Sequence, residues 1–290
     1  MNSHTLSVAA TPELYAQPEH VASPADGHFY HTMDVPGHGL QQGFFDLRAG
    51  VSDYLGGVSV RGRRVLEMGT ADGFLCFHME RAGAEVVAFD LAKDAPWDVV
   101  PFADASKQEY AQHLARHNDL RRRLNAAFWF CHRAFRSRAR LVHGSVYTVP
   151  PAIGPVDITT FGAILLHVRD PFLALQQALR LTRETVIITE PFLKENFPPD
   201  FLAQFPLPPQ TPAADADFHL FQQARGPFMV FLPNPAVGAP WDTWWYLSPD
   251  LLRQFIGVLG FGRTTINYHR QAFAGGRTVP FYTLVGHRTA

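Results

Sequence analysis

Five short apolar runs, separated by segments with helical spacing, constrain the fold of this chain more than any other feature. They span residues 63–69, 85–90, 138–145, 156–167 and 184–192. Each run has the length of a buried strand, and most are followed by a segment whose apolar residues recur with a helical period. Strands that alternate with helices predict a mainly parallel sheet with helices on both faces.

The C-terminal part of the chain closes this pattern. Residues 248–261 predict a helix that ends in glycine, and residues 264–270 and 279–288 predict a final pair of strands. We therefore expect one α/β domain over residues 29–290. Residues 1–28 are polar and weakly patterned, and predict an N-terminal arm, either mobile or carrying a few short helices.

A proline- and phenylalanine-rich stretch interrupts the pattern between the fifth strand and the last helix. Residues 191–240 hold 11 of the 23 prolines and 8 of the 24 phenylalanines. We interpret residues 191–247 as a cap over the sheet edge, where such loops bind substrates. An aromatic cap favours a small apolar or aromatic substrate, whereas a second small core under a long loop is the alternative. Its only basic residues before Pro240 are Lys194 and Arg225, too few for a nucleic-acid surface.

The overall composition also limits the classes of partner. Lys plus Arg is 25 and Asp plus Glu is 26, so a net charge of −1 gives no general attraction to nucleic acid or to anionic membranes. No apolar run approaches the length of a membrane span, and no basic and apolar leader is present. Cys76 and Cys131 have no metal-binding spacing, so we expect no metal and a cytoplasmic location. The sequence leaves the oligomeric state open.

The strongest functional signal is the segment VLEMGTADGF, residues 65–74. Gly69 and Gly73 let the backbone turn sharply after the first strand. The turn lies at the edge where open parallel sheets bind ligands. Its spacing differs from both the dinucleotide-binding pattern and the phosphate-binding loop. A plain strand-to-helix connection is the alternative interpretation.

Residues at the next two strand ends add to this signal. Asp90 ends the second strand, where a carboxylate can accept two hydrogen bonds from a ribose diol. The alternative is that Asp90 caps a nearby turn, but the glycine turn beside it favours the ribose interpretation. Ser145 follows the third strand and Trp97 follows the second, so either could line an adenine pocket. An ordinary turn residue and a core residue are the respective alternatives.

The tracts EMGTADG, AFDLA, FGAILLHVRDP and VIITEPF occur in the order and spacing that resemble class I S-adenosylmethionine (SAM)-dependent methyltransferases. The resemblance covers roughly residues 29–190 and resumes at 241–288. Ala71 stands where the commonest form of the first motif has glycine. The tracts FYHTMDVPGHG, WDVVP and TWWYLSPDLLRQFIGVLGF resemble a subfamily distantly similar to the enzyme that transfers a carboxymethyl group to wobble uridine in tRNA.

The resemblance implies a Rossmann-like, seven-stranded αβα sandwich with a closing antiparallel hairpin, and SAM as the cofactor. It also implies a set of residues that would hold SAM. These are Glu67, Gly69, Thr70 and Gly73 for the methionine part, Asp72 for its amino group, Asp90 and Leu91 for ribose and the adenine face, Ser145 and Val146 beside adenine, and Phe161 and Gly162 beside the sulfonium.

Four residues are candidates for catalysis. His167 follows the fourth strand, and a histidine at that place can act as a general base or can bind backbone at a strand end. Tyr30 and His31 precede the first strand and could fold over the methionine end of SAM or pack on the sheet. Glu190 ends the fifth strand and could bind substrate, act as a base or cap the strand.

These residues support several hypotheses on function. The first is a methyltransferase of a small, apolar or aromatic molecule with an oxygen or nitrogen nucleophile. The alternatives are an enzyme that cyclises SAM and releases methylthioadenosine, a tRNA-modifying transferase, and a SAM-binding protein without catalysis.

Overall fold

The computed structural model describes residues 13–290 except 93, 94, 96, 194, 196, 206–215, 217, 221, 222 and 224. Residues 1–12 of the expected arm, and the cap residues Lys194 and Phe221, therefore lie outside the described residues.

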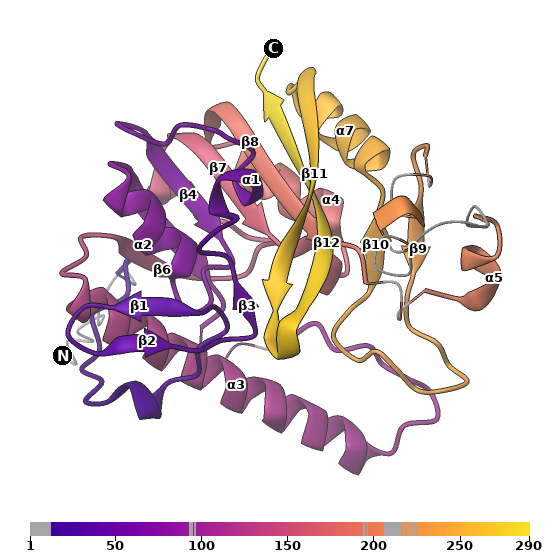
Figure 1. Cartoon of the computed structure of the whole chain (residues 1–290), viewed down its shortest axis with the longest axis horizontal. Coiled ribbons are helices and arrows are strands. Elements are labelled where there is room, and N and C mark those ends of the chain that lie inside the picture. The colour runs from indigo at the N-terminus through magenta and orange to yellow at the C-terminus, as the bar shows by residue number, and fades with distance from the viewer. Residues whose placement is uncertain are drawn as a thin grey trace, which may run out of the picture.

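Within the described residues, the central sheet has eight strands in the order β3-β11-β12-β8-β7-β4-β5-β6 (Figure 1). Their bounds are β3 (Phe45–Asp46), β4 (Arg64–Met68), β5 (Glu85–Asp90), β6 (Arg140–His143), β7 (Val156–Gly162), β8 (Thr182–Pro191), β11 (Arg263–Phe273) and β12 (Arg277–His287). Strands β4 to β8 pair in parallel, and β12, β11 and β3 extend the sheet with antiparallel pairs. The predicted fold class and closing hairpin are confirmed.

The sheet has one strand more than expected. Strand β3 contains only two residues, which pair with Ala272 and Phe273 at the end of β11. Two residues are too few to produce an alternating pattern in the sequence, so this edge strand had no detectable signal. The fourth strand is also shorter than predicted. It ends at Gly162, and Ala163, with a φ of +52°, leads into the 3₁₀ turn η3 (Leu165–His167).

Helices cover both faces of the sheet (Figure 1). One face carries α1 (Val51–Tyr54), α2 (Phe74–Arg81) and the last turns of α3 (Lys107–Ala134), and the other carries α4 (Pro171–Leu179) and α7 (Pro249–Val258). The remaining elements are η1 (Pro24–Asp26), η2 (Pro151–Ile153), η5 (Ala274–Gly276), α5 (Pro199–Leu202), and the hairpins β1 (Met33–Val35) with β2 (Gly39–Gln41) and β9 (Met229–Phe231) with β10 (Trp245–Leu247). Among the described residues, no helix is both long and apolar enough to cross a bilayer.

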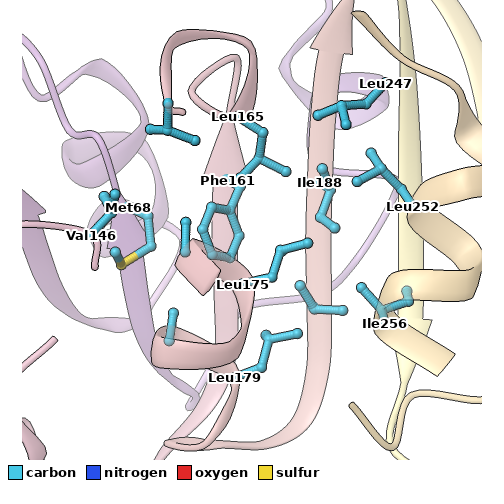
Figure 2. Packing of buried hydrophobic residues seen from close by; sticks show 14 of the residues in the cluster. Met68, Val146, Phe161, Leu165, Leu175, Leu179, Ile188, Leu247, Leu252 and Ile256 are labelled. Carbon is cyan, nitrogen blue, oxygen red and sulfur yellow. The ribbon is translucent and has the colours of Figure 1, made fainter. Parts of the chain in front are cut away.

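Local sequence explains where the helices on the second face begin. Asp170 is the N-cap of α4 and accepts a hydrogen bond from the Leu173 N–H at 2.9 Å, with Pro171 in the first turn. Ser248 caps α7 in the same way. Figure 2 shows how these two helices pack onto the central strands. The residues in contact are Leu175 and Leu179 of α4, Leu252 and Ile256 of α7, and Phe161 and Ile188 of the sheet.

The described part of the N-terminal arm is packed against the body of the molecule. The Ala16 N–H donates to the Leu141 carbonyl at the end of the sheet, at 2.8 Å. Gly27 lies so close to Ala127 of α3 that a Cβ at Gly27 would come within 2.9 Å of that residue. Residues 13–28 therefore belong to the domain surface.

The phenylalanines of the predicted cap pack mainly on one another. Phe192, Phe197 and Leu232 are buried and join the main core, and Tyr246 of β10 contacts the rings of Phe192, Phe197 and Phe228. This arrangement favours the alternative considered from the sequence, a small core under a long loop, and that core is continuous with the main one. Phe231 is an exception because its side chain is 48 % exposed.

Substitutions in α7 test how this helix packs on the core shown in Figure 2. Leu252 is fully buried, so Leu252→Ala removes apolar contacts and leaves a cavity, and should lower the free energy of unfolding by about 2–5 kcal/mol. Val258 lies on the same helix and is 78 % exposed, so Val258→Ala should change the free energy of unfolding by less than about 0.5 kcal/mol. Urea unfolding measures both. Equal effects of the two substitutions would contradict this packing.

Candidate functional site

The turn between β4 and α2 passes three times through the left-handed region of backbone conformation. Its φ angles are +79° at Gly69, +50° at Ala71 and +86° at Gly73. Alanine rarely adopts such a φ, because its Cβ crowds the backbone, at a cost of roughly 1–2 kcal/mol. The φ at Ala71 explains why glycine would suit this position, and it makes Ala71 a strained part of the turn.

Asp90 ties the end of β5 to this turn. Its Oδ2 accepts the N–H of Ala71 at 2.8 Å, and its Oδ1 accepts the N–H of Leu91 at 2.7 Å. Burial raises the pKa of Asp90, and these two N–H donors act in the opposite direction. The carboxylate therefore lies where the sequence predicted it, at the sheet edge beside the glycine turn. It retains lone pairs for further donors.

Glu67 and Thr70 form a second polar contact in the same place. The Thr70 hydroxyl donates to Glu67 Oε2 at 2.7 Å, and both side chains are buried. Burial raises the pKa of Glu67 to about 8. Thr160 of β7 is the register partner of Glu67, and its hydroxyl has no hydrogen-bond partner among the described residues.

Asp72 is held by the tract that precedes the first predicted strand. His31 donates its backbone N–H to Oδ2 and places Nδ1 against Oδ1, both at 2.7 Å. Tyr30 packs edge-on to the His31 ring, with centroids 5.0 Å apart. Burial, reinforced by the charges of Asp242 and Asp72, raises the pKa of Tyr30 to about 12, so its phenol stays protonated at neutral pH.

His167 lies on η3 and is oriented by a residue that the sequence analysis did not single out. Its Nδ1 donates to the backbone carbonyl of Asp242 at 2.5 Å. Asp242 also acts electrostatically on Tyr30 and on His117 of α3. The predicted catalytic candidates His167 and Tyr30 therefore both lie within electrostatic range of Asp242. Asp242 lies between Trp241 and Trp244 in the predicted substrate cap, and nothing in that sequence pattern distinguished it from its neighbours.

Glu190 is buried beneath the turn that carries His167. Its Oε1 accepts the N–H of Leu165 at 2.9 Å, and its side chain is 3 % exposed. Burial raises the pKa of Glu190 to about 8, and the backbone hydrogen bonds from this turn act in the opposite direction. In this geometry Glu190 positions the turn, which is the capping alternative considered from the sequence.

The residues predicted to lie beside adenine (Ser145, Val146 and Trp97) and beside the sulfonium (Phe161) differ in where their side chains lie. Val146 and Phe161 point into the core, as Figure 2 shows, so only their backbone reaches the sheet edge. Ser145 is half-buried, and its hydroxyl accepts the N–H of Tyr147 at 3.2 Å. Trp97 is stacked on His117 at 5.2 Å, which covers one face of the indole.

Two further residues at this edge were not identified from the sequence. His143 ends β6 as the register partner of Asp90, and its Nδ1 is buried with no hydrogen-bond partner among the described residues. Tyr54 of α1 is buried, and a Cβ added to Gly162 would lie 3.2 Å from its hydroxyl. The nearest sequence signal for His143 was its position at a predicted strand end.

Within the described ranges, no group of three or more His, Cys, Asp or Glu side chains is arranged to hold a metal ion.

Comparisons with known proteins give structural but no sequence matches. No family model and no curated protein sequence matches the chain. Among solved structures, the N-terminal domain of EvdMO1 with SAH bound is 14 % identical, with a TM-score of 0.45, over 89 % of this chain and 90 % of that chain. Magnesium protoporphyrin IX methyltransferase (ChlM) from Synechocystis PCC 6803 with bound SAH is 11 % identical, with a TM-score of 0.46, over 84 % and 82 %. The 1,6-didemethyltoxoflavin-N1-methyltransferase of Burkholderia thailandensis is 15 % identical, with a TM-score of 0.44, over 83 % and 76 %. What this chain binds has to be inferred from its own residues.

The buried carboxyl of Glu67 makes the stability of the protein depend on pH. Its pKa is about 8 in the folded state against an ordinary 4.5, so the folded state binds the proton more tightly. Its contribution to stability is complete below about pH 4.5 and is lost as the pH rises toward about 8. Glu67→Gln cannot ionise, so its free energy of unfolding relative to wild type should increase across this window.

Urea unfolding at several pH values measures this difference. Glu184→Gln serves as the control, because Glu184 is a surface residue paired with Arg63, and its curve should run parallel to that of the wild type. A Glu67→Gln curve that also runs parallel to wild type would show that Glu67 is ionised throughout.

Proposed function

We propose that this chain is a SAM-dependent methyltransferase whose acceptor is a small apolar or aromatic molecule. The observation that carries the proposal is the contact between Asp90 and Ala71, which joins a carboxylate at one strand end to a left-handed turn at the next. Open parallel sheets bind nucleoside ligands at this edge, with an acidic side chain on the ribose.

The polar atoms around the turn fit such a ligand. His143 Nδ1 and Trp97 Nε1 are buried, and neither has a hydrogen-bond partner among the described residues. Buried polar groups are normally hydrogen-bonded, so unpartnered atoms at a sheet edge suit a ligand that supplies the missing donors and acceptors. Asp90 lies in register with His143 across β5 and β6, which places a carboxylate for the ribose beside one of these atoms.

Each residue would then have a distinct role. Asp90 would accept hydrogen bonds from the ribose hydroxyls, and His143 and the backbone at Ser145 would face the base. Glu67, held by Thr70, would face the positively charged methionine amino group, which would favour its ionised form. SAM, when bound, supplies a methyl group on a positively charged sulfur.

The chain itself would orient the acceptor and exclude water. The tract with Tyr30 and His31 folds over the glycine turn, and its backbone continues into the β1–β2 hairpin. His167 Nδ1 is committed to the Asp242 carbonyl, so its Nε2 is the atom that can take a proton. The scarcity of Lys and Arg in residues 191–240 supports a small acceptor rather than tRNA.

Calorimetric titration with SAM tests the proposed cofactor site. Asp90→Asn removes a charged acceptor of ribose hydrogen bonds and should weaken SAM binding roughly tenfold to a hundredfold. Asp104→Asn is the control, because Asp104 is exposed and lies before α3. Equal affinities of wild type and both variants would contradict the role of Asp90. No heat of binding with the wild type would contradict the proposed function.

Incubation with SAM alone tests which reaction the site supports. A methyltransferase without its acceptor should leave SAM unchanged, because no acceptor molecule is present to take the methyl group. Mass spectrometry of the nucleosides measures the outcome. Methylthioadenosine above the level of the protein-free control would favour the SAM-cyclising alternative and contradict methyl transfer.

A further inference from the structure

The pair formed by His31 and Asp72 is built differently from the other polar contacts of the site. One residue occupies both oxygens of the carboxylate, with its backbone N–H on Oδ2 and its ring Nδ1 on Oδ1, each at 2.7 Å. Asp72 is fully buried, and His31 is 9 % exposed. Two bonds between the same two residues fix the plane of the imidazole as well as its position.

This geometry determines which ring nitrogen is available. An ionised carboxylate only accepts hydrogen bonds, so the proton of a neutral His31 ring lies on Nδ1. Nε2 then carries the lone pair, and among the described residues nothing donates a hydrogen bond to it. The rings of Tyr30 and Phe74 pack against the imidazole at 5.0 Å and 5.5 Å and prevent it from turning away.

His167 offers a comparison within the same region. Its Nδ1 is also held, but by the neutral backbone carbonyl of Asp242. When a ring nitrogen accepts a proton, the imidazole becomes positively charged, and a carboxylate stabilises that charge more strongly than a carbonyl does. Of the two histidines, His31 is therefore the better equipped to take a proton during a reaction.

We propose that His31, positioned by Asp72, is the general base of the reaction, and that the acceptor is a neutral hydroxyl group. The proposal rests on the proposed function. A hydroxyl must lose its proton as it is methylated, and a base makes it a better nucleophile. A carboxylate is already deprotonated at neutral pH, and a neutral amine attacks with its own lone pair and becomes acidic only afterwards, so neither needs such a pair.

The bond between the methyl carbon and the sulfur of SAM breaks with its electron pair left on sulfur, and a bond forms between that carbon and the acceptor oxygen. The hydroxyl proton moves to His31 Nε2. Asp72 stays ionised and faces the positive ring. Asp72 is then a positioning residue for His31 and not a ligand of the methionine amino group.

Nitrogen NMR of the histidine rings tests the pair directly in the wild-type protein. We expect His31 to carry its proton on Nδ1 with a bare Nε2, and that proton to resonate far downfield because of the carboxylate. The downfield signal should vanish in Asp72→Asn and persist in His20→Gln, whose replaced histidine is exposed in the same N-terminal part. A His31 ring protonated on Nε2 and bare on Nδ1 would overturn the proposal. The tautomer is read on the wild type, so the test does not depend on how well a variant folds.

Calorimetry with SAM on the same proteins separates this proposal from the proposed function. A wild type that fails to bind SAM contradicts the proposed function, and the NMR result still decides whether the pair exists. His31→Gln and Asp72→Asn should bind SAM within about threefold of wild type, because each variant keeps an oxygen at residue 72 that accepts the backbone N–H of residue 31 and so keeps the turn in place. A loss of more than about tenfold in Asp72→Asn would assign Asp72 to the methionine part and overturn its role here.

Methyl transfer to a panel of small alcohols, phenols, amines and carboxylic acids tests the acceptor class. Transfer should go to a hydroxyl oxygen and fall about 10²-fold to 10⁴-fold in His31→Gln at saturating SAM. A product methylated on a nitrogen or on a carboxylate oxygen, or a His31→Gln variant that transfers at the wild-type rate, would overturn the proposal.

Discussion

The left-handed turn at residues 69–73 is the constraint on which the rest of the site depends. Three positive φ angles in five residues bring the chain from the end of β4 directly into the first turn of α2. Strained backbone of this kind persists because surrounding contacts hold it in place. Asp90 supplies one of these contacts through the Ala71 N–H, and His31 supplies another through Asp72. The end of β5 and the N-terminal tract are thereby fixed relative to the turn.

A second feature of this region is the number of acidic groups that it holds away from water. Glu67, Asp72 and Glu190 are buried, and Asp90 is half-buried, in a chain whose net charge is only −1. Each carboxyl is held by an N–H, a hydroxyl or an imidazole. Burying such groups opposes folding unless they are paired, so a cluster of them at one sheet edge is more readily explained by function than by stability. A ligand with a positively charged sulfur and a positively charged amino group is complementary to such a site.

The local elements of the fold could be predicted from the sequence because their signals are local. The parallel strands, the glycine turn and the Asp170 cap all follow from residues that are neighbours in the chain. Ala71 could be recognised as a departure from the usual motif, but the sequence did not show that its φ is +50°. The two-residue strand β3 exists only because β11 offers it an edge to pair with.

The contacts that define the candidate site join residues far apart in the sequence. His31 and Asp72 are 41 positions apart, and His167 and Asp242 are 75 apart. Residue types at strand ends suggested His167 and Glu190, and the tract before the first strand suggested His31, but only the folded chain shows that His31 is bound to Asp72. Periodicity also could not show that Phe161 points into the core, because a strand buried on both faces has no polar side.

A crystal structure of the protein in complex with S-adenosylhomocysteine would test most directly whether the nucleoside binds at the turn of residues 69–73. The account predicts that the nucleoside lies across the ends of β4 and β5, with its ribose hydroxyls on Asp90 and its amino acid part along the turn at residues 69–73. A ligand bound elsewhere on the molecule would contradict this account. So would a fully occupied ligand at this edge that leaves Asp90 in contact with backbone N–H groups alone.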